Sequence, residues 1–236
     1  MKKSDTILLS HGSGGAMTRR LIDELLVSEF SNPLLEQLED QAVFEVAEGR
    51  LAFTTDSFVI SPVFFPGGDI GELAVYGTVN DLAVGGAEPL YLSMGLIIEE
   101  GFSMSELEKI IRSAAKACRL TGVKVITGDT KVVERGKGDG IFINTSGIGV
   151  VGEGVNLSSQ SLKTGDRIIV SGTLAEHGFA VLAKRRGLSF ASPILSDCGP
   201  VYGLCRAALQ AAPGKVKAMR DPTRGGRAAV LNEWAG

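Results

Sequence analysis

Four aspartates in this sequence stand at breaks in apolar segments, where a carboxylate is well placed to bind a cation. Asp40 precedes a predicted strand, Asp56 and Asp129 end predicted strands, and Asp81 lies within a predicted helix. The flanking threonines and glycines, as in FTTDS and VITGDT, favour a magnesium site, because Mg²⁺ shares hard oxygen ligands between one or two carboxylates and a nucleotide. Each aspartate taken alone is also compatible with a simple helix or turn cap.

Asp81 is the aspartate that capping explains least well. It lies within GTVNDLAVGGAEPLYLS, residues 77–93, a small and apolar stretch that favours burial. A buried carboxylate without a partner is destabilising, so it requires a cation, a metal or several hydrogen-bond donors. We therefore expect Asp81 to be a functional ligand.

Residues beside these aspartates are further candidate ligands for a nucleotide. Thr54, Thr55 and Thr130 offer hydroxyl donors, Asn80 offers an amide, and Lys131 offers a point charge to phosphate. All five are predicted to contact the nucleotide or its phosphates.

Two glycine-rich stretches carry weaker signals. HGSGG, with Gly12, Gly14 and Gly15, lacks the spacing of a phosphate-binding loop, and no GxxxxGK(S/T) motif occurs in the chain. It is equally compatible with a flap over a ligand and with a flexible N-terminal tail. DPTRGGRAAV places Asp221 and Arg224 at a predicted helix start, which fits either an anion site or a capped surface turn.

Length, composition and charge describe an ordinary globular chain. Its 236 residues, of which 44% are hydrophobic and 22% charged, are enough to bury a core. A net charge of −3 provides no basic surface for nucleic acid. No apolar run is long enough to cross a membrane or to act as a secretory signal. We therefore expect a cytoplasmic protein without nucleic-acid or membrane partners.

Hydrophobic periodicity predicts helices and strands in alternation before Gly154. The clearest helix, residues 103–120, opens with a capping box formed by Ser103 and Glu106 and is followed by Gly122. Further helices are predicted at residues 17–30 and 71–84, and strands at residues 51–55, 90–98, 123–130 and 140–152. This order predicts an α/β or α+β fold.

A second unit is predicted to begin near Gly154. Its segments are a turn plus strand within residues 162–172, helices at 174–187 and 201–212, and the start of a last helix. One or two strands are a thin core for an independent unit of roughly 80 residues. We therefore predict two domains, residues 1–153 and 154–236, and expect the second to be incomplete.

Taken together, these segments resemble the HypE family of hydrogenase maturation proteins. That family belongs to a superfamily with aminoimidazole ribonucleotide synthetase, selenophosphate synthetase and thiamine-monophosphate kinase. The similarity runs along essentially the whole chain, through HGSGG, LEDQAVF, FFPGGDIGELAVYGTVNDLAVGGAEP, TGDTKVV, FINTSGIG and RDPTRGG. It implies a PurM-like α+β fold of two domains. The first would supply strands to a dimer-wide β-barrel with flanking helices, and the second would be an incomplete sheet with helices.

The resemblance also implies an ATP-dependent enzyme that forms a homodimer. Members of the family act on a carbamoyl group that HypF places on their own C-terminal cysteine. Its dehydration gives a thiocyanate, whose cyanide reaches the iron of NiFe hydrogenase through the HypC–HypD complex. This chain ends in NEWAG and has no terminal cysteine. We therefore expect a carbamoyl dehydratase that binds ATP but does not make thiocyanate on itself.

Several aspartates match metal-binding positions of the superfamily. Asp40, Asp56 and Asp81 match its metal-binding aspartates, and Asp221 in RDPTRGG matches a further one in the selenophosphate synthetase branch. The cation that compensates Asp81 would then be Mg²⁺ bridging to ATP.

The GDT segment matches a nucleotide-binding position. It contains Asp129 and Thr130 and is followed by Lys131, and HGSGG matches a segment that closes over the nucleotide. Asp81 and Lys131 are the expected catalytic residues. Two alternatives stay open: another ATP-dependent kinase or synthetase of the superfamily, which TVNDLAVGGAEP argues against, and a non-catalytic scaffold that docks HypF or the HypC–HypD complex.

Overall fold

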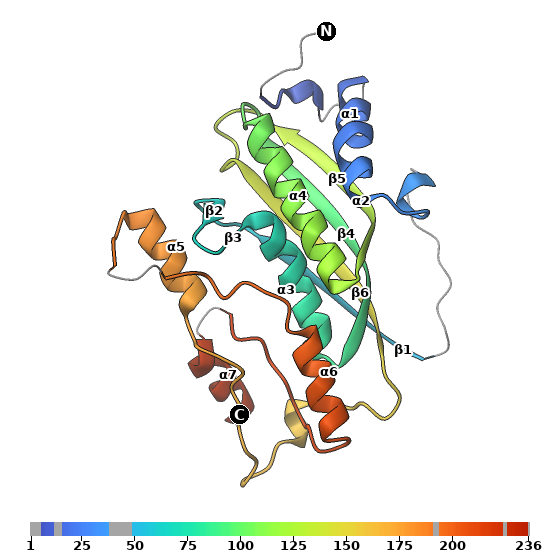
Figure 1. Cartoon of the computed structure of the whole chain (residues 1–236), viewed down its shortest axis with the longest axis vertical. Helices are drawn as coiled ribbons and strands as arrows, with labels where there is room; N and C mark the ends of the chain where they lie inside the picture. Colours follow the sequence, from blue (N-terminus) through green and yellow to red (C-terminus); the bar gives the residue numbers. More distant parts are fainter. Residues whose placement is uncertain (1–5, 12–15, 38–48, 191–193, 224–225, 236) are drawn as a thin grey trace.

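A mixed four-stranded sheet forms the centre of the computed structural model, which describes residues 6–11, 16–37, 49–190, 194–223 and 226–235. The strands follow the order β1–β6–β4–β5 (Figure 1). β4 and β5 are parallel, and the other two neighbouring pairs are antiparallel. The strands are β1 (Arg50–Phe58), β4 (Ala87–Glu99), β5 (Lys124–Val133) and β6 (Ile141–Val151), with a short hairpin of β2 (Phe64–Phe65) and β3 (Gly68–Asp69).

Two long helices, α3 (Ile70–Val84) and α4 (Met104–Thr121), pack side by side over one face of this sheet (Figure 1). Beside α4 lies a continuous helical stretch made of α1 (Ala16–Leu21), a π-helical segment (Ile22–Val27) and α2 (Ser28–Phe30), flanked by the 3₁₀ turns Leu9–His11 and Leu35–Gln37. None of the helices in the described ranges has the length and apolarity that a membrane-spanning segment needs.

The close packing of α3 explains why the covered face is so well buried. A Cβ atom on Gly71 would lie 2.2 Å from the carbonyl oxygen of Ile110 in α4. A Cβ atom on Gly77 would lie 2.7 Å from the ring of Phe58 on β1. Only glycine permits these approaches. The fully buried residues of the helix include Ile70, Ala74, Val75 and Val79.

All seven helices and strands predicted before Gly154 are present. Two strands extend further than predicted, so that Asp56 and Asp129 lie within β1 and β5 rather than at their ends. The reason is that both strands remain paired beyond these residues, with Phe58 still opposite Ile143 of β6.

The second unit differs from its prediction. Its helical elements are the 3₁₀ turn Ser159–Ser161, α5 (Glu176–Arg186), α6 (Tyr202–Ala211) and α7 (Gly226–Ala235). No strand occurs among the described residues after Val151, so the strand predicted within residues 162–172 is wrong. A strand needs a hydrogen-bonded neighbour, and in the described part of the chain none pairs with this segment, where Ile169 is 90% exposed.

Candidate active site

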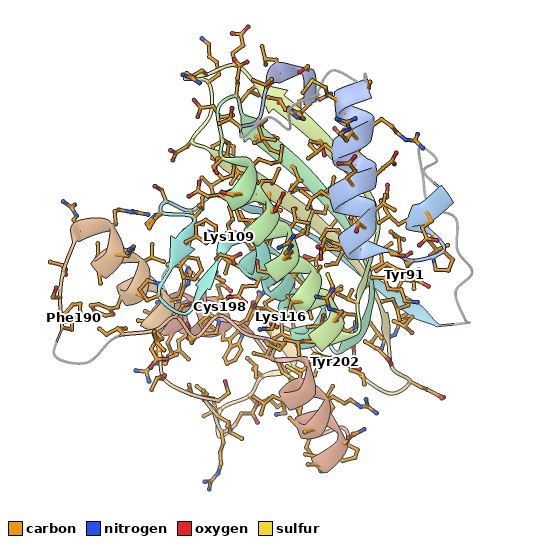
Figure 2. All side chains as sticks on the ribbon, turned by 45° about the horizontal axis from the view of Figure 1, so that its top comes forward. Tyr91, Lys109, Lys116, Phe190, Cys198 and Tyr202 are labelled. Carbon is orange, nitrogen blue, oxygen red and sulfur yellow. The ribbon has the colours of Figure 1, made fainter. Side chains whose placement is uncertain are left out.

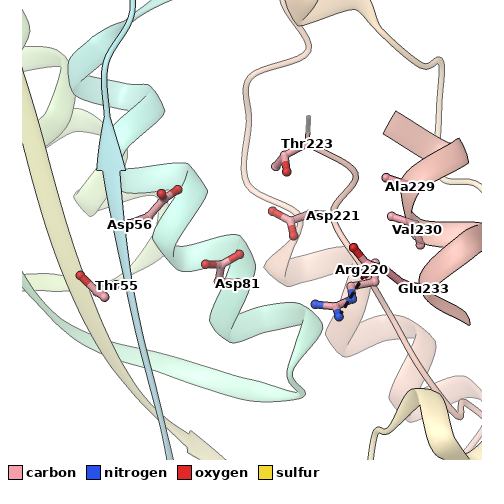
Figure 3. Close-up of a pocket in the computed structure, with 9 residues that line it drawn as sticks. All are labelled: Thr55, Asp56, Asp81, Arg220, Asp221, Thr223, Ala229, Val230 and Glu233. Atoms are coloured by element: carbon pink, nitrogen blue, oxygen red, sulfur yellow. Dashed lines mark ion pairs between the residues drawn. The ribbon is translucent and has the colours of Figure 1, made fainter. Parts of the chain in front are cut away.

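A polar pocket lies between β1, α3 and the segment that leads into α7 (Figure 3). Its cavity has a volume of about 270 Å³ and is lined by three aspartates from distant parts of the sequence, Asp56, Asp81 and Asp221. We call it the aspartate pocket. The other lining residues are Thr55, Arg220, Thr223, Ala229, Val230 and Glu233. Asp40, the fourth aspartate predicted to bind metal, lies outside the described residues.

The packing of β1 on α3 positions two of the carboxylates. Asp56 lies opposite Thr145 of β6 in the register of the sheet. The hydroxyl of Thr145 donates to the carbonyl of Ala74 in α3. The side chains of Thr145 and Asp56 therefore both lie on the face of the sheet that α3 covers. Asp81 lies in the last turns of α3 and is half-buried. The hydroxyl of Thr54 donates to Asp81 Oδ2 at 3.0 Å. The alternation of β1 and the packing of α3 therefore direct both aspartates into one pocket.

Burial and neighbouring negative charge raise the pKa of two carboxyl groups of the pocket, Asp81 and Asp221. Burial, reinforced by the charge of Asp81, raises the pKa of Asp221 from 3.8 to about 6. Burial also raises the pKa of Asp81, and the charge of Asp56 acts in the same direction, whereas the hydrogen bond from Thr54 lowers it. Carboxylates whose pKa values are raised in this way are short of compensating positive charge. A divalent cation would supply it.

The donor set of the pocket fits magnesium better than a metal held by protein alone. The described residues contain no group of three or more histidine, cysteine, aspartate or glutamate side chains that can hold a metal ion by themselves. Magnesium does not need such a cage, because it commonly takes one or two carboxylates and fills its other positions with phosphate oxygens and water. The pocket therefore fits a magnesium ion that is shared with a nucleotide.

Asp129 and Lys131 lie on β5, away from the aspartate pocket. Across the sheet, Asp129 is in register with Gly95 of β4, Gly95 with Asn144 of β6, and Asn144 with Ser57 of β1. Two strands thus separate β5 from β1, a distance of about 14 Å at the usual strand spacing. Both side chains are exposed and alternate with the buried Thr130, which places them on the face opposite α3. A single chain does not bring them to the pocket.

The predicted hydroxyl donors have partners of their own. The hydroxyl of Thr54 is used by Asp81, as described above. Thr55 lines the pocket, but its hydroxyl donates to the carbonyl of Thr145 at 3.2 Å. Thr130 is only 8% exposed and faces the helical layer. These threonines therefore position strands and carboxylates in this structure.

Asn80 ties α3 to the second unit. Its Nδ2 donates to the carbonyl of Gly199 at 3.0 Å, and its Oδ1 accepts from the backbone N–H of Val201 at 2.9 Å. Residues 199–201 lead directly into α6, which packs against α3. The Asn80 amide was predicted to contact a nucleotide, but both its N–H donor and its carbonyl acceptor are hydrogen-bonded to backbone groups.

The glycine-rich candidates are not part of the described structure. Gly12, Gly14 and Gly15 of HGSGG and Arg224 of DPTRGG lie outside the described residues. A role for HGSGG as a flap over a nucleotide therefore stays a prediction.

Sequence reasoning misses two charged residues of the pocket, Arg220 and Glu233. They form an ion pair in which Arg220 Nη2 lies 3.3 Å from Glu233 Oε2. Arg220 carries a usable signal, because it directly precedes Asp221 in RDPTRGG. Glu233 carries none, since its place depends on α7 lying beside the pocket (Figure 3).

Two family models place the chain in a class. The N-terminal domain of AIR synthase related proteins matches residues 38–151, and the C-terminal domain of the same proteins matches residues 163–236. The fold is therefore PurM-like. The first matched region supplies Asp56 and Asp81 to the pocket, and the second supplies Asp221.

Within this class the similarity is to HypE proteins. Carbamoyl dehydratase HypE of Bradyrhizobium diazoefficiens is 52% identical over 227 residues, which cover 96% of this chain and 66% of that protein. A crystal structure of HypE in complex with ATP matches with a TM-score of 0.94 at 47% identity, over 98% of this chain and 68% of that one. A crystal structure of a HypE–HypF complex matches with a TM-score of 0.77 at 49% identity, over 94% of this chain and 70% of that one. The chain belongs to the HypE family and spans about two thirds of the length of these relatives.

Proposed function

We propose that this protein is an ATP-dependent carbamoyl dehydratase that serves the maturation of NiFe hydrogenase. The observation that carries the proposal is 52% identity to a protein of that name over nearly the whole chain. The aspartate pocket supports it. The proposed reaction converts an S-carbamoyl thiol and ATP into a thiocyanate, ADP and phosphate. The carbamoyl oxygen leaves with the phosphate, and the amide nitrogen gives up both of its protons.

ATP and magnesium fit the aspartate pocket by their chemistry. The ATP complex of a HypE protein supports the nucleotide. Asp56, Asp81 and Asp221 would hold the magnesium ion, with Asp40 as a further ligand. When bound, Mg-ATP supplies the phosphoryl group that activates the carbamoyl oxygen. The contribution of the protein is then positioning and charge neutralisation, as is usual in phosphoryl transfer.

We further infer that the site is completed in a homodimer. The face of the sheet opposite α3 carries Phe53, which is 70% exposed, and Ile97, which is also exposed. Among the described residues β1 lies at the edge of the sheet, and exposed apolar side chains favour packing against another apolar face. Two such sheets, face to face, would give the dimer-wide barrel expected from the sequence. The partner subunit's Lys131 would then approach the pocket past β1, whose Thr55 lies on the dimer face and also lines the pocket.

The proposed partners follow from the family. The HypE–HypF complex supports HypF as the source of the carbamoyl group. The HypC–HypD complex is the proposed acceptor of the cyanide. Both assignments for this chain stay proposals.

A direct test of the activity uses a cysteine peptide carbamoylated on sulfur. We expect the protein with Mg-ATP to produce both ADP and the nitrile band of a thiocyanate in the infrared spectrum. ADP without a nitrile band would instead indicate another ATP-dependent activity of the superfamily. Bound nucleotide with neither product would indicate a docking scaffold.

A mixed dimer tests the shared site. Asp81→Asn and Lys131→Ala chains carrying different affinity tags are co-expressed, and only dimers with both tags are collected. If each site takes Asp81 from one subunit and Lys131 from the other, the mixed dimer keeps one intact site and loses one, so it should bind about half the nucleotide of the wild-type dimer. No tight binding by the mixed dimer would mean that each chain uses its own Lys131.

A further inference from the structure

Arg220 is the only cation among the nine described residues that line the aspartate pocket. It directly precedes Asp221 and extends into the space between that aspartate and Glu233 of α7 (Figure 3). Its positive charge lowers the pKa of both Asp81 and Asp221, against the effect of burial. Without a metal ion, Arg220 is thus the counter-charge that the described residues of the pocket provide to these carboxylates.

The ion pair between Arg220 and Glu233 holds the guanidinium only loosely. The two side chains are 52% and 56% exposed, and Nη2 lies 3.3 Å from Oε2. Exposed pairs of this kind contribute little to stability, so exchanging the partner requires little free energy. The guanidinium therefore remains available to another anion that enters the pocket.

A nucleotide needs such a cation in this pocket. A single divalent ion leaves the triphosphate of ATP negatively charged, and three carboxylates surround it. Within one chain, Lys131 lies on the opposite face of the sheet, and the partner subunit's Lys131 would supply only one further positive charge. The planar guanidinium of arginine matches phosphate oxygens in a bidentate manner that a lysine cannot reproduce.

We propose that Arg220 binds the phosphate chain of the nucleotide and exchanges its ion pair with Glu233 for phosphate oxygens. The exchange moves the guanidinium charge from the carboxylates to the phosphates, which leaves Asp81 and Asp221 to the metal. This inference rests on the proposed function, because it requires a nucleotide in the aspartate pocket. Arg220 then opposes metal binding when nucleotide is absent and supports nucleotide binding when it is present.

This double role predicts effects of opposite sign in one variant. In Arg220→Met, Mn²⁺ alone should bind about two- to fivefold more tightly, because a competing positive charge is gone. The affinity for Mg-ATP should fall roughly tenfold to a hundredfold, the usual effect of losing a charged hydrogen-bond donor to phosphate. Arg220→Lys should recover part of the ATP affinity. Manganese binding is measured by electron paramagnetic resonance and nucleotide binding by titration calorimetry.

Two matched variants complete the experiment. Arg206→Met removes an exposed arginine of α6 that does not line the pocket, and it should change neither affinity. Glu233→Gln should not lower the ATP affinity and should raise it by at most about fivefold, because it removes only the exposed anion that competes with phosphate for Arg220. Unchanged ATP binding in Arg220→Met, or parallel losses of manganese and ATP binding, would overturn the role of Arg220. A wild-type protein that binds no ATP would instead overturn the proposed function itself.

Discussion

The two faces of the central sheet carry different parts of the predicted ligand set. On the face covered by α3, tight packing places Asp56 and Asp81 in one pocket with Asp221. On the opposite face, Asp129 and Lys131 stand exposed beside Gly95 and Ile97 of β4, the strand that also carries the Tyr91 labelled in Figure 2. Because side chains alternate along a strand, a contiguous motif such as GDTK is divided between the two faces. Residues that share a motif therefore need not share a site within one chain.

The largest expected effect is on the covered face. Asp81→Asn keeps the shape of the side chain and removes a charge that we assign to magnesium, so we expect the affinity for Mg-ATP to fall at least about a hundredfold. Lys131→Ala should lower the affinity about tenfold, because it removes a point charge to phosphate. Titrations of ATP at several magnesium concentrations measure both.

The magnesium dependence separates the two faces. Binding by Asp81→Asn should no longer respond to magnesium, whereas binding by Lys131→Ala should keep the wild-type response. Circular dichroism checks that both variants are folded. If the Lys131→Ala variant has also lost its response to magnesium, then magnesium binding does not depend on the residues of the covered face alone.

Much of the covered face could be predicted from the sequence. The helix that carries Asp81 was recognisable because its residues are small and apolar, and a carboxylate in such a segment requires compensation. The helix of residues 103–120 was recognisable from its capping-box sequence, and the structure contains the N-cap bond of that motif: Ser103 Oγ accepts from the N–H of Glu106 at 3.4 Å. These signals are local, and local patterns are what a sequence displays directly.

The division between the faces could not be predicted, because it depends on register. The pairing of β4 with β5 shifts between Leu92 and Ser93, and only that register fixes which residues of β5 point towards the helices. The same limit explains the wrong strand around Ile169, since strand formation requires a partner elsewhere in the chain. The roles of Asn80 and Arg220 likewise depend on how the second unit lies beside α3.

A smaller effect is expected from breaking the tie between α3 and the second unit. Asn80→Ala leaves the carbonyl of Gly199 and the N–H of Val201 without their partner, so the free energy of unfolding should fall by about 1–3 kcal/mol. Urea unfolding measures the loss. Limited proteolysis should show that residues after Val151 become more accessible.

An asparagine on the other face is the matched control. Asn144 Nδ2 donates to the carbonyl of Asp56 and to the hydroxyl of Ser57, both at 2.9 Å, and its side chain is exposed. At a protein concentration at which the proposed dimer is dissociated, water can replace these bonds, so Asn144→Ala should change the stability of the subunit by less than about 1 kcal/mol. If the two variants lose equal stability, the tie at Asn80 is no more important than an ordinary surface contact.

The smallest expected effect is a dependence of stability on pH that belongs to the covered face. In the folded chain the pKa of Asp221 is about 6, above its ordinary value of 3.8, so the folded state binds this proton more tightly than the unfolded state does. The stabilisation from protonation is therefore present at low pH and is lost as the pH rises from about 4 through 6. Above that range the carboxylate destabilises the metal-free fold.

Asp221→Asn removes this penalty, because the amide resembles the protonated acid. The full shift corresponds to about 3 kcal/mol, and screening at a partly exposed site reduces it, so we expect the metal-free variant to be more stable than wild type at pH 7.5 by about 1 kcal/mol. The difference should vanish near pH 4, as followed by thermal unfolding in buffers with a chelator. Added Mg-ATP should reverse the order at pH 7.5, because only the wild-type carboxylate gains a ligand. A variant that is less stable than wild type at every pH, with or without Mg-ATP, would show that Asp221 serves the fold rather than the pocket.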